Sequence, residues 1–278
     1  MTITTTTSAE AWSPSVNHLT PGDAVPEALI LTLGTQVGGV EGDEPVVRCA
    51  FVDDAPCGFI PEGQPIPEEN PELSEVLVAT GKVASLSRIS REQWEQENAA
   101  MNLSQSVTRA ITVAANTAFL SQEAPTERLT PPTGIVNIKG LITGQVGTSL
   151  DGLIDLIAKL QTNLSNPTHV VVSPHGWATL SKIKTKVDSN ESLLGAGTTA
   201  VERMILGLPV IVTPALGNTV GLVVDKSQVL TAFGGIEIAT SQHYFFGSDS
   251  LALRATWRFG QTVLHPERLG LFNIQADK

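Results

Sequence analysis

One glycine-rich segment has the residue types and the spacing of a nucleotide-binding turn. Gly195-Ala-Gly-Thr-Thr-Ala200 matches the G-x-G-x-x-A pattern in which a backbone turn cradles a pyrophosphate. Such a turn follows a strand, whereas this one follows the polar run Ser189-Asn-Glu-Ser. Asp225, the next acidic candidate for a ribose contact, lies farther along the chain than the fingerprint requires. A nucleotide-binding α/β enzyme therefore stays only as an alternative, which a nucleotide-induced shift in melting temperature would support.

The other reactive side chains do not form a recognisable site. Cys49 and Cys57 are too few for a disulfide scaffold and are not spaced as zinc ligands. The sequence contains neither a G-x-S-x-G elbow nor a Walker A motif. The histidines are scattered, with no pair at ligand spacing: His18, His169, His175, His243 and His265. We therefore expect no catalytic residues, no cofactor and no metal, and a protein that is not an enzyme.

Carboxylates gather in a proline-rich stretch near residue 65. The four glutamates are Glu62, Glu68, Glu69 and Glu72. Catalytic carboxylates need an apolar setting to tune them, and this stretch offers none. We interpret the segment as an acidic loop tip that faces solvent or a partner.

Composition and charge exclude further classes of protein. The chain has 278 residues, 41% of them hydrophobic, which is enough for a sizeable core. Its formal net charge of -11 and the lack of clustered Lys and Arg argue against a nucleic-acid clamp. The N-terminus does not resemble a signal peptide, and no 18-residue apolar run occurs. We expect a soluble protein made in a cytoplasm.

The element that must organise the chain is a helix predicted over residues 90–122. Ser90 and Gln93 have capping-box spacing at its start, and Pro125 ends it. At 1.5 Å per residue such a helix would be about 50 Å long. The predicted buried stripe is rich in alanine and consists of Leu103, Val107, Ala110, Ile111, Ala114 and Ala118. We expect this stripe to pack closely against a sheet.

Two segments before the helix need a partner surface. Residues 1–28 are polar and contain several prolines, so they cannot bury enough surface to form a domain and are predicted to be an arm. Trp12 is unfavourable in water, which favours an arm that lies on another surface. Strands predicted at 46–52 and 75–89 flank the acidic tip and form a long hairpin. A two-stranded hairpin is marginal alone, and a loop this long in a compact chain usually has a function. We expect both segments to be extended contact elements.

After the helix the pattern alternates between helix and strand. A helix begins near Ser149, strands are predicted at 169–173, 207–214 and 221–225, and Pro174 opens a second helix. The one apolar face of the first helix is predicted to comprise Leu150, Leu153, Ile154, Ile157, Leu160 and Leu164. Residues 251–259 then alternate apolar and polar side chains, as in a strand with one buried face.

The order of these elements resembles the major capsid protein of tailed bacteriophages. The resemblance is carried by Lys82-Val-Ala-Ser-Leu-Ser-Arg-Ile-Ser90, Gly207-Leu-Pro-Val-Ile-Val-Thr-Pro214 and the stretch from Phe246 through Arg254-Ala-Thr-Trp-Arg-Phe-Gly260 to Pro266. It implies an α+β, Hong Kong 97-like capsid fold with an N-terminal arm, an extended hairpin loop, a peripheral domain with a long spine helix, and an inserted axial α/β domain. The implied divisions are the arm and lead-in at 1–45, the hairpin loop at 46–89, the spine helix at 90–130, the axial domain at 131–240 and the peripheral C-terminal strands at 241–278.

The resemblance also implies a function. Such proteins self-assemble through hexamers and pentamers into an icosahedral head that encloses double-stranded DNA without sequence-specific binding. The implied partners are other copies of the chain and portal, separate scaffolding or decoration proteins, with no membrane; the implied location is the virion capsid, assembled in the host cytoplasm. The expected inter-subunit contacts are Trp12, Ile60, Glu62, Ile66, Glu68, Glu69, Glu72, Arg88 and Arg91.

Encapsulin nanocompartment shells share this fold and remain an alternative. They would carry an amphipathic N-terminal helix for cargo, and the proline-punctuated arm lacks that periodicity. Because Met1 begins almost directly at the arm, we expect a separate scaffold protein or none. The hairpin from Ala50 to Thr80 contains no lysine, so the isopeptide cross-link of some family members is not expected.

Overall fold

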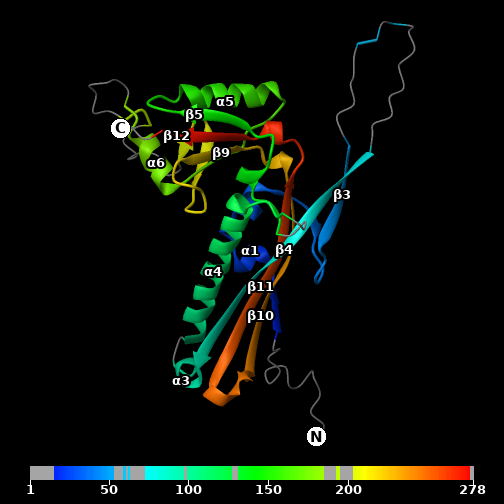
Figure 1. Ribbon diagram of the computed structural model, residues 1–278, viewed down its shortest axis with the longest axis vertical. Helices are drawn as coiled ribbons and strands as arrows, with labels where there is room; N and C mark the ends of the chain where they lie inside the picture. The colour runs from blue at the N-terminus through cyan, green and yellow to red at the C-terminus, as the bar shows by residue number, and fades with distance from the viewer. Residues whose placement is uncertain are drawn as a thin grey trace.

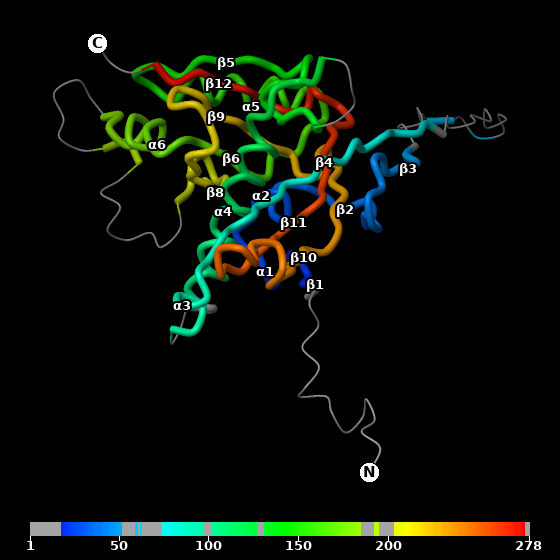
Figure 2. Tube along the Cα trace, turned by 60° about the horizontal axis from the view of Figure 1, so that its bottom comes forward, coloured from blue at the N-terminus to red at the C-terminus, as the bar shows by residue number. Residues whose placement is uncertain are grey.

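The computed structural model describes residues 16–52, 59–60, 62, 73–96, 99–126, 131–184, 192–194 and 203–275. These residues form two six-stranded sheets. Figure 1 shows an elongated molecule in which the longest strands and helix α4 make up the lower body. The second sheet and helix α5 lie at the upper end, and Figure 2 shows the same separation from another side.

The sheet of the lower body is built on three long strands. Its order is β1 (Val16–Leu19), β10 (Val229–Phe245), β11 (Ser250–Val263), β4 (Leu73–Ser90) and β3 (Val46–Val52), and β2 (Thr35–Gly39) also pairs with β10. The β11–β4 ladder is antiparallel and unbroken from Ser250 opposite Ser90 to Gly260 opposite Thr80. Strand β11 is central, which explains why Ala252 and Thr256 on its predicted polar side are also buried.

Trp257 anchors the core beneath this sheet. It is fully buried, and its ring centroid lies 4.8 Å from that of Phe259. Its indole Nε1 donates a hydrogen bond to the Gly234 carbonyl oxygen at 3.0 Å, at an irregularity where the β10–β11 register shifts. The indole therefore satisfies a carbonyl that the regular ladder leaves without a partner.

Helix α4 (Ala99–Ser121) is the predicted spine, but it begins later than the sequence pattern indicated. Ser90 is still the last residue of β4, and its hydroxyl accepts from the Gln93 backbone N–H to cap the short helix α3 (Arg91–Trp94). Helix α3 buries none of its residues. The prediction of one helix from 90 was therefore wrong, because the first ten residues have no apolar stripe to hold them on the body.

The predicted buried stripe of α4 was also partly wrong. Ala110 and Ala114 are exposed, whereas the buried row follows four-residue steps through Val107, Ile111, Ala115 and Phe119. In the predicted stripe, alanine counted equally with the larger apolar side chains. Burying a phenylalanine removes far more apolar area from water than burying an alanine, so Phe119 determines which face turns inward.

The lead-in before β2 belongs to the core rather than to an arm. Helix α2 (Leu29–Leu33) buries Leu29, Ile30 and Leu33, and it packs on α4. The Leu29 backbone N–H donates to the Asn116 Oδ1 atom at 2.7 Å, which satisfies a donor at the start of the helix. The short helix α1 (Pro21–Ala24) precedes it and contacts β10.

The upper sheet contains the strands predicted at 169–173, 207–214 and 221–225. Its order is β5 (Ile142–Val146), β12 (Gly270–Ile274), β9 (Val220–Val224), β6 (His169–Val172), β8 (Leu208–Val212) and β7 (Met204–Ile205). Helix α5 (Asp151–Thr162) packs on β5 and β12, while α6 (Pro174–Ser181) starts at the predicted proline. Its core includes the valines of β6 with Leu153, Leu156 and Leu160. Strands β5 and β12 were not predicted.

A buried carboxylate holds the junction between the two sheets. Asp225 follows β9 and precedes the 3-10 helix η3 (Lys226–Gln228), which leads directly into β10. Its oxygens accept from the Asn166 backbone N–H at 2.7 Å and from the Ser227 backbone N–H at 3.0 Å. These charge-assisted bonds fix the point where the chain leaves the upper sheet.

The base of the predicted hairpin has a small core. Strand β3 pairs antiparallel with the first part of β4, and Val47 and Val78 are buried with Val40, Leu230 and Ala232. The hairpin is therefore packed on β2 and β10 at its base. In Figure 1, β3 and the start of β4 lead away from the rest of the sheet.

Candidate assembly surfaces

The residues that the structure describes do not gather into a metal centre. Among them, no group of three or more His, Cys, Asp or Glu side chains is placed to hold a metal ion. The predicted fingerprint Gly195 to Ala200 lies outside the described part of the chain. Within that described part, no helix is both long and apolar enough to cross a membrane. The features that stand out are exposed apolar surfaces at three places.

The first surface is the β3–β4 hairpin. Phe59 is completely exposed, Ile60 is partly exposed and Glu62 lies at the surface. At the base, Arg48 forms an ion pair with Glu75 at 3.5 Å. The predicted contact residues Trp12, Ile66, Glu68, Glu69 and Glu72 lie outside the described residues.

The second surface is the tip formed by α3 and the β10–β11 turn. The turn contains the 3-10 helix η4 (Phe246–Ser248), and Asp249 follows with a positive φ of 43°. The Arg91 Nε donates to Asp249 Oδ1 at 2.8 Å. The Arg88 guanidinium lies 5.1 Å above the Phe245 ring, and its Nε donates to the Ser250 hydroxyl at 3.3 Å. The two arginines thus brace the tip.

Two aromatic side chains project from this braced tip. Tyr244 is 67% exposed and Phe246 is 80% exposed. Tyr244 packs edge-on against Phe245 with ring centroids 4.7 Å apart. Exposed aromatic anchors on a fixed support are typical of protein interfaces. Sequence reasoning missed them, although three consecutive aromatic residues beside Gly247 were a usable signal.

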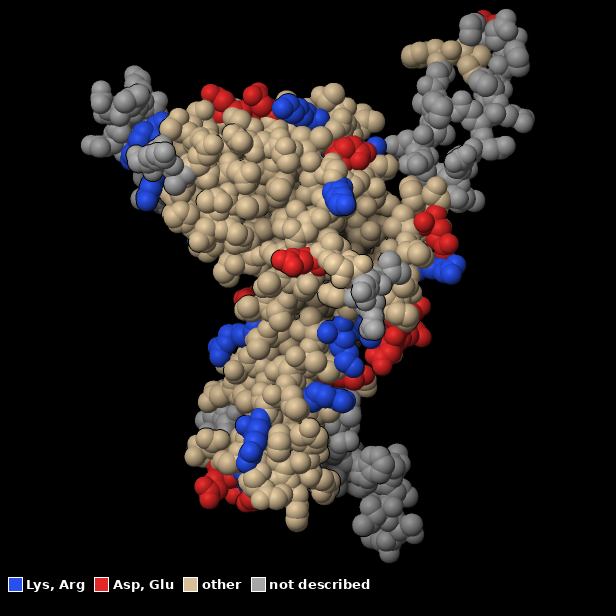
Figure 3. All heavy atoms as spheres, viewed as in Figure 1, with Lys and Arg blue, Asp and Glu red and all other residues tan. Residues whose placement is uncertain are grey.

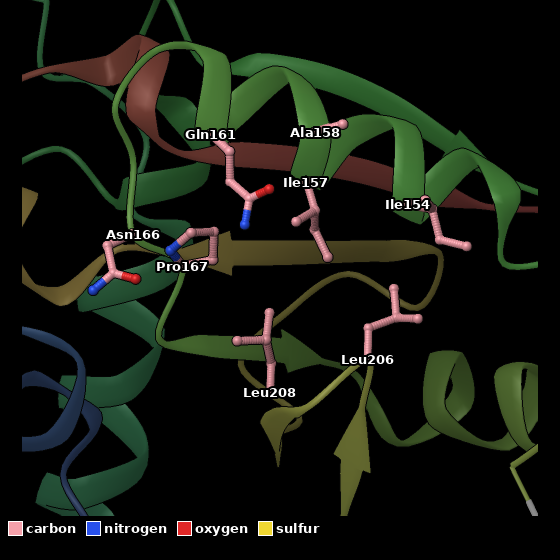
Figure 4. Close-up of a pocket in the computed structure, with 8 residues that line it drawn as sticks. All are labelled: Ile154, Ile157, Ala158, Gln161, Asn166, Pro167, Leu206 and Leu208. Atoms are coloured by element: carbon pink, nitrogen blue, oxygen red, sulfur yellow. The ribbon is translucent and has the colours of Figure 1, made fainter.

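The third surface is a groove of about 510 Å³ in the upper unit. Figure 4 shows Ile154, Ile157 and Gln161 pointing from α5 toward Leu206 and Leu208, which come from the β7–β8 hairpin. Among the described residues that line the groove, none carries a charge. Ile154 is 48% exposed and Leu206 is 46% exposed, so the predicted single apolar face of α5 is split between the core and this groove.

Backbone strain marks Leu206. It has a φ of 51°, and Gly207 after it has a φ of 81°. Hairpin turns with two left-handed residues favour Asn, Asp or Gly, whereas a leucine there costs about 1–2 kcal/mol. Strain at a residue whose apolar side chain also lines the groove points to a function beyond folding.

His169, at the start of β6, is a structural histidine in the upper unit. Burial and, to a smaller extent, the charge of Lys226 lower the pKa of its imidazole below 6.5. Its Nδ1 lies 3.1 Å from the Thr168 hydroxyl.

The model of the phage capsid family matches residues 25–274. The chain belongs to the phage capsid family. Solved structures agree in fold: the capsid of a native GTA particle with C5 symmetry has a TM-score of 0.66 at 15% identity, covering 90% of each chain.

Two further solved structures have the same fold. Gordonia phage Cozz has a TM-score of 0.65 at 15% identity, covering 96% of this chain and 90% of its own. Microbacterium phage Oxtober96 has a TM-score of 0.69 at 11% identity, covering 99% of this chain and 100% of its own. The chain matches no curated protein sequence. The Hong Kong 97-like fold predicted from the sequence is confirmed, and the capsid protein is a structural protein of the virion.

The four predicted contact residues that the structure describes fall into two separate groups. Arg88 and Arg91 come together at the tip, whereas Ile60 and Glu62 belong to the hairpin at the other end of β4. Figure 3 shows Lys, Arg, Asp and Glu scattered in small groups over this view, with uncharged surface between them. This face therefore lacks the single-sign field that nucleic-acid binding requires.

Proposed function

We propose that the chain is the major capsid protein that self-assembles through hexamers and pentamers into the icosahedral head of a tailed phage. The observation that carries the proposal is the presence of three exposed apolar surfaces on one elongated subunit. They lie on the hairpin, the tip and the groove in the upper unit. Contacts in three directions are what a subunit needs to close a shell rather than a dimer.

We assign the two sheets to two domains with different roles in the shell. The domain boundaries expected from the sequence place 131–240 in an axial domain and 241–278 in the peripheral strands. The strand pairing favours assigning all of β10 to the peripheral sheet and β12 to the axial sheet. We propose that the axial sheet packs around hexamer and pentamer axes through its groove, while the tip and the hairpin join neighbouring subunits.

The remaining partners follow from the proposed shell. The head would enclose double-stranded DNA without sequence-specific contacts, which suits the net charge of -11. Portal, scaffolding or decoration proteins would complete the particle, and assembly would take place in the host cytoplasm. An acidic wall that does not bind DNA tightly would leave the packaged DNA held by confinement.

Assembly of the purified protein tests the proposal. Gradient sedimentation and negative-stain imaging should show closed shells with hexameric and pentameric units. Ile154→Ser should reduce shell yield, because it removes an apolar side chain from the groove, whereas Lys159→Ser on the same helix should not. Both residues are exposed, so neither change should lower the melting temperature. Monomers alone, across protein concentrations and salts, would refute the proposal.

A further inference from the structure

We infer that two copies of this chain form a twofold-symmetric dimer through the outer side of helix α4. The contact surface is a groove of about 500 Å³ between α4 and the turn at residues 25–27, together with the outward row of α4 beside it. In Figure 1, α4 runs along the left side of the lower body. This surface is separate from the three on which the proposed shell rests. The dimer can therefore be measured without shells, and its failure would leave the proposed function standing.

The outward row of α4 is almost free of charge. The chain has 28 Asp and Glu residues, and none of them falls in α4. Val113 is 59% exposed, and the Thr117 hydroxyl donates to the Val113 carbonyl oxygen at 2.9 Å. A hydroxyl with a partner in its own helix costs little to bury. The row follows three- and four-residue steps, and all its members are exposed: Ser106, Arg109, Val113 and Thr117.

The groove beside this row is formed before any partner arrives. Val25 and Pro26 lie on one wall, and Thr112 lies on the other. The Thr112 hydroxyl donates to a carbonyl oxygen of its own helix at 2.9 Å. Asn116 fastens the two walls, because its Oδ1 accepts from the Leu29 backbone N–H at 2.7 Å. A row of side chains on a second helix can enter such a groove without rearranging it.

Two opposite charges line the groove without pairing with each other. Glu27 lies on the turn and Arg109 lies on α4, and both are exposed. Within the part of the chain that the structure describes, neither side chain forms an ion pair or a hydrogen bond. A twofold axis through the groove exchanges its two sides. Arg109 of each copy then faces Glu27 of the other, so both charges gain a partner twice.

This arrangement of charge favours a second copy of the chain over other occupants. One cation and one anion on the same surface match their own image after a rotation of 180°, whereas a partner of one sign would meet a like charge. A nucleic acid needs clustered cations, and α4 supplies one. Helices related by a perpendicular twofold axis run antiparallel, so their dipoles attract. The outward row spans about three helical turns, and an interface of that size gives a weak dimer that exchanges with monomer.

A charge exchange tests the dimer. Sedimentation velocity of the fraction without shells, over a range of protein concentrations, should show a monomer–dimer equilibrium. Arg109→Glu should raise the dissociation constant about tenfold, because it turns two attractive contacts into repulsive ones. Glu27→Arg should have a similar effect. The double variant exchanges the two charges and should return the dissociation constant to within about threefold of the unmodified value. Both sites are exposed, so each variant should keep its melting temperature.

Lys159→Glu on α5 is the matched control. It reverses a charge at an exposed helical site outside the groove, so the dissociation constant should stay within about twofold. A monomer at every concentration would overturn the inference, and so would a dimer that Arg109→Glu leaves unchanged. Loss of the dimer in both single variants without recovery in the double variant would show that the two charges do not face each other, and would also overturn it.

Discussion

The Arg91 guanidinium and the Asp249 carboxylate join two segments that are 158 residues apart in sequence, with Nε and Oδ1 separated by 2.8 Å. The Arg91 backbone N–H also donates to the Asp249 carbonyl oxygen at 3.1 Å. Helix α3 is therefore fastened to the β10–β11 turn twice. The pair holds the support from which Tyr244 and Phe246 project.

Removing this pair should affect assembly more than folding. The Arg91 side chain is 44% exposed and that of Asp249 is 73% exposed, so Arg91→Ala should lower the free energy of unfolding by no more than about 1 kcal/mol. Shell yield should fall, because the exposed aromatic residues lose their fixed support. Denaturant unfolding and gradient sedimentation measure the two effects. Lys139→Ala, at an exposed site shortly before β5, is the control, and equal losses of yield in both variants would contradict this role for Arg91.

The packing of α4 can be tested with two adjacent alanines. Ala115 is 1% exposed in the core, whereas Ala114 is at the surface. Ala115→Leu should overpack the seam between α4 and the sheet and lower the free energy of unfolding by about 1–3 kcal/mol. Ala114→Leu makes the same change outside the seam and should leave the melting temperature nearly unchanged. The reverse order of effects would mean that the helix is rotated from the orientation described above.

The sequence predicted most of the regular elements because their signals are local. The alternation through Trp257, the valine run of β6 and the proline that opens α6 each indicate an element without knowledge of its neighbours. The resemblance to phage capsid proteins then supplied their arrangement. Arg88 and Arg91 lie together at one tip, and their role as contact residues stays a prediction.

What the sequence did not predict depends on tertiary context. The face that α4 buries depends on where the Phe119 side chain packs. Strand β12 forms because it pairs with β5, which is distant in sequence. The groove around Leu206 combines two segments on either side of β6. No local pattern shows that a leucine in a turn is strained. Such features become visible only when the backbone angles and the neighbouring residues are known.

The strain at Leu206 predicts opposite effects on stability and assembly. Leu206→Asn should stabilise the isolated subunit by about 1 kcal/mol, because asparagine tolerates the left-handed conformation. It should also weaken shell formation, because the groove loses an apolar wall. Leu164→Asn is a matched control, since Leu164 has a φ of 61° and is 75% exposed but does not line the groove. It should stabilise the subunit and leave assembly intact; equal assembly of both variants would remove the functional role of Leu206.

His169 predicts a pH dependence of stability. Its pKa in the folded state is lowered, first by burial and then by Lys226, so the unfolded chain binds the proton more readily. Stability should therefore be unaffected by this group well above pH 6.5 and should decrease as the pH falls below that value toward the folded pKa. Melting temperatures between pH 7.5 and 5 should decrease less in His169→Gln. Lys226→Gln removes only the smaller cause and should have an intermediate effect. An unchanged slope in His169→Gln would assign the pH dependence to other groups.

The hairpin tip should be dispensable for folding and required for assembly. Replacing residues 61–72 with a short Gly-Ser turn leaves the buried base at Val47 and Val78 in place, so the subunit should stay soluble with a near-normal melting temperature. Each contact made by a tip is weak, but a closed shell repeats it at every subunit, so its loss should leave capsomers or monomers. Light scattering and negative-stain imaging measure the outcome.

A full-length variant with Glu62, Glu68, Glu69 and Glu72 changed to Gln separates the charge of the tip from its length. It should weaken shells without abolishing them. Closed particles from the shortened chain at normal yield would show that the tip is not an assembly element, and insoluble protein would place the tip in the core.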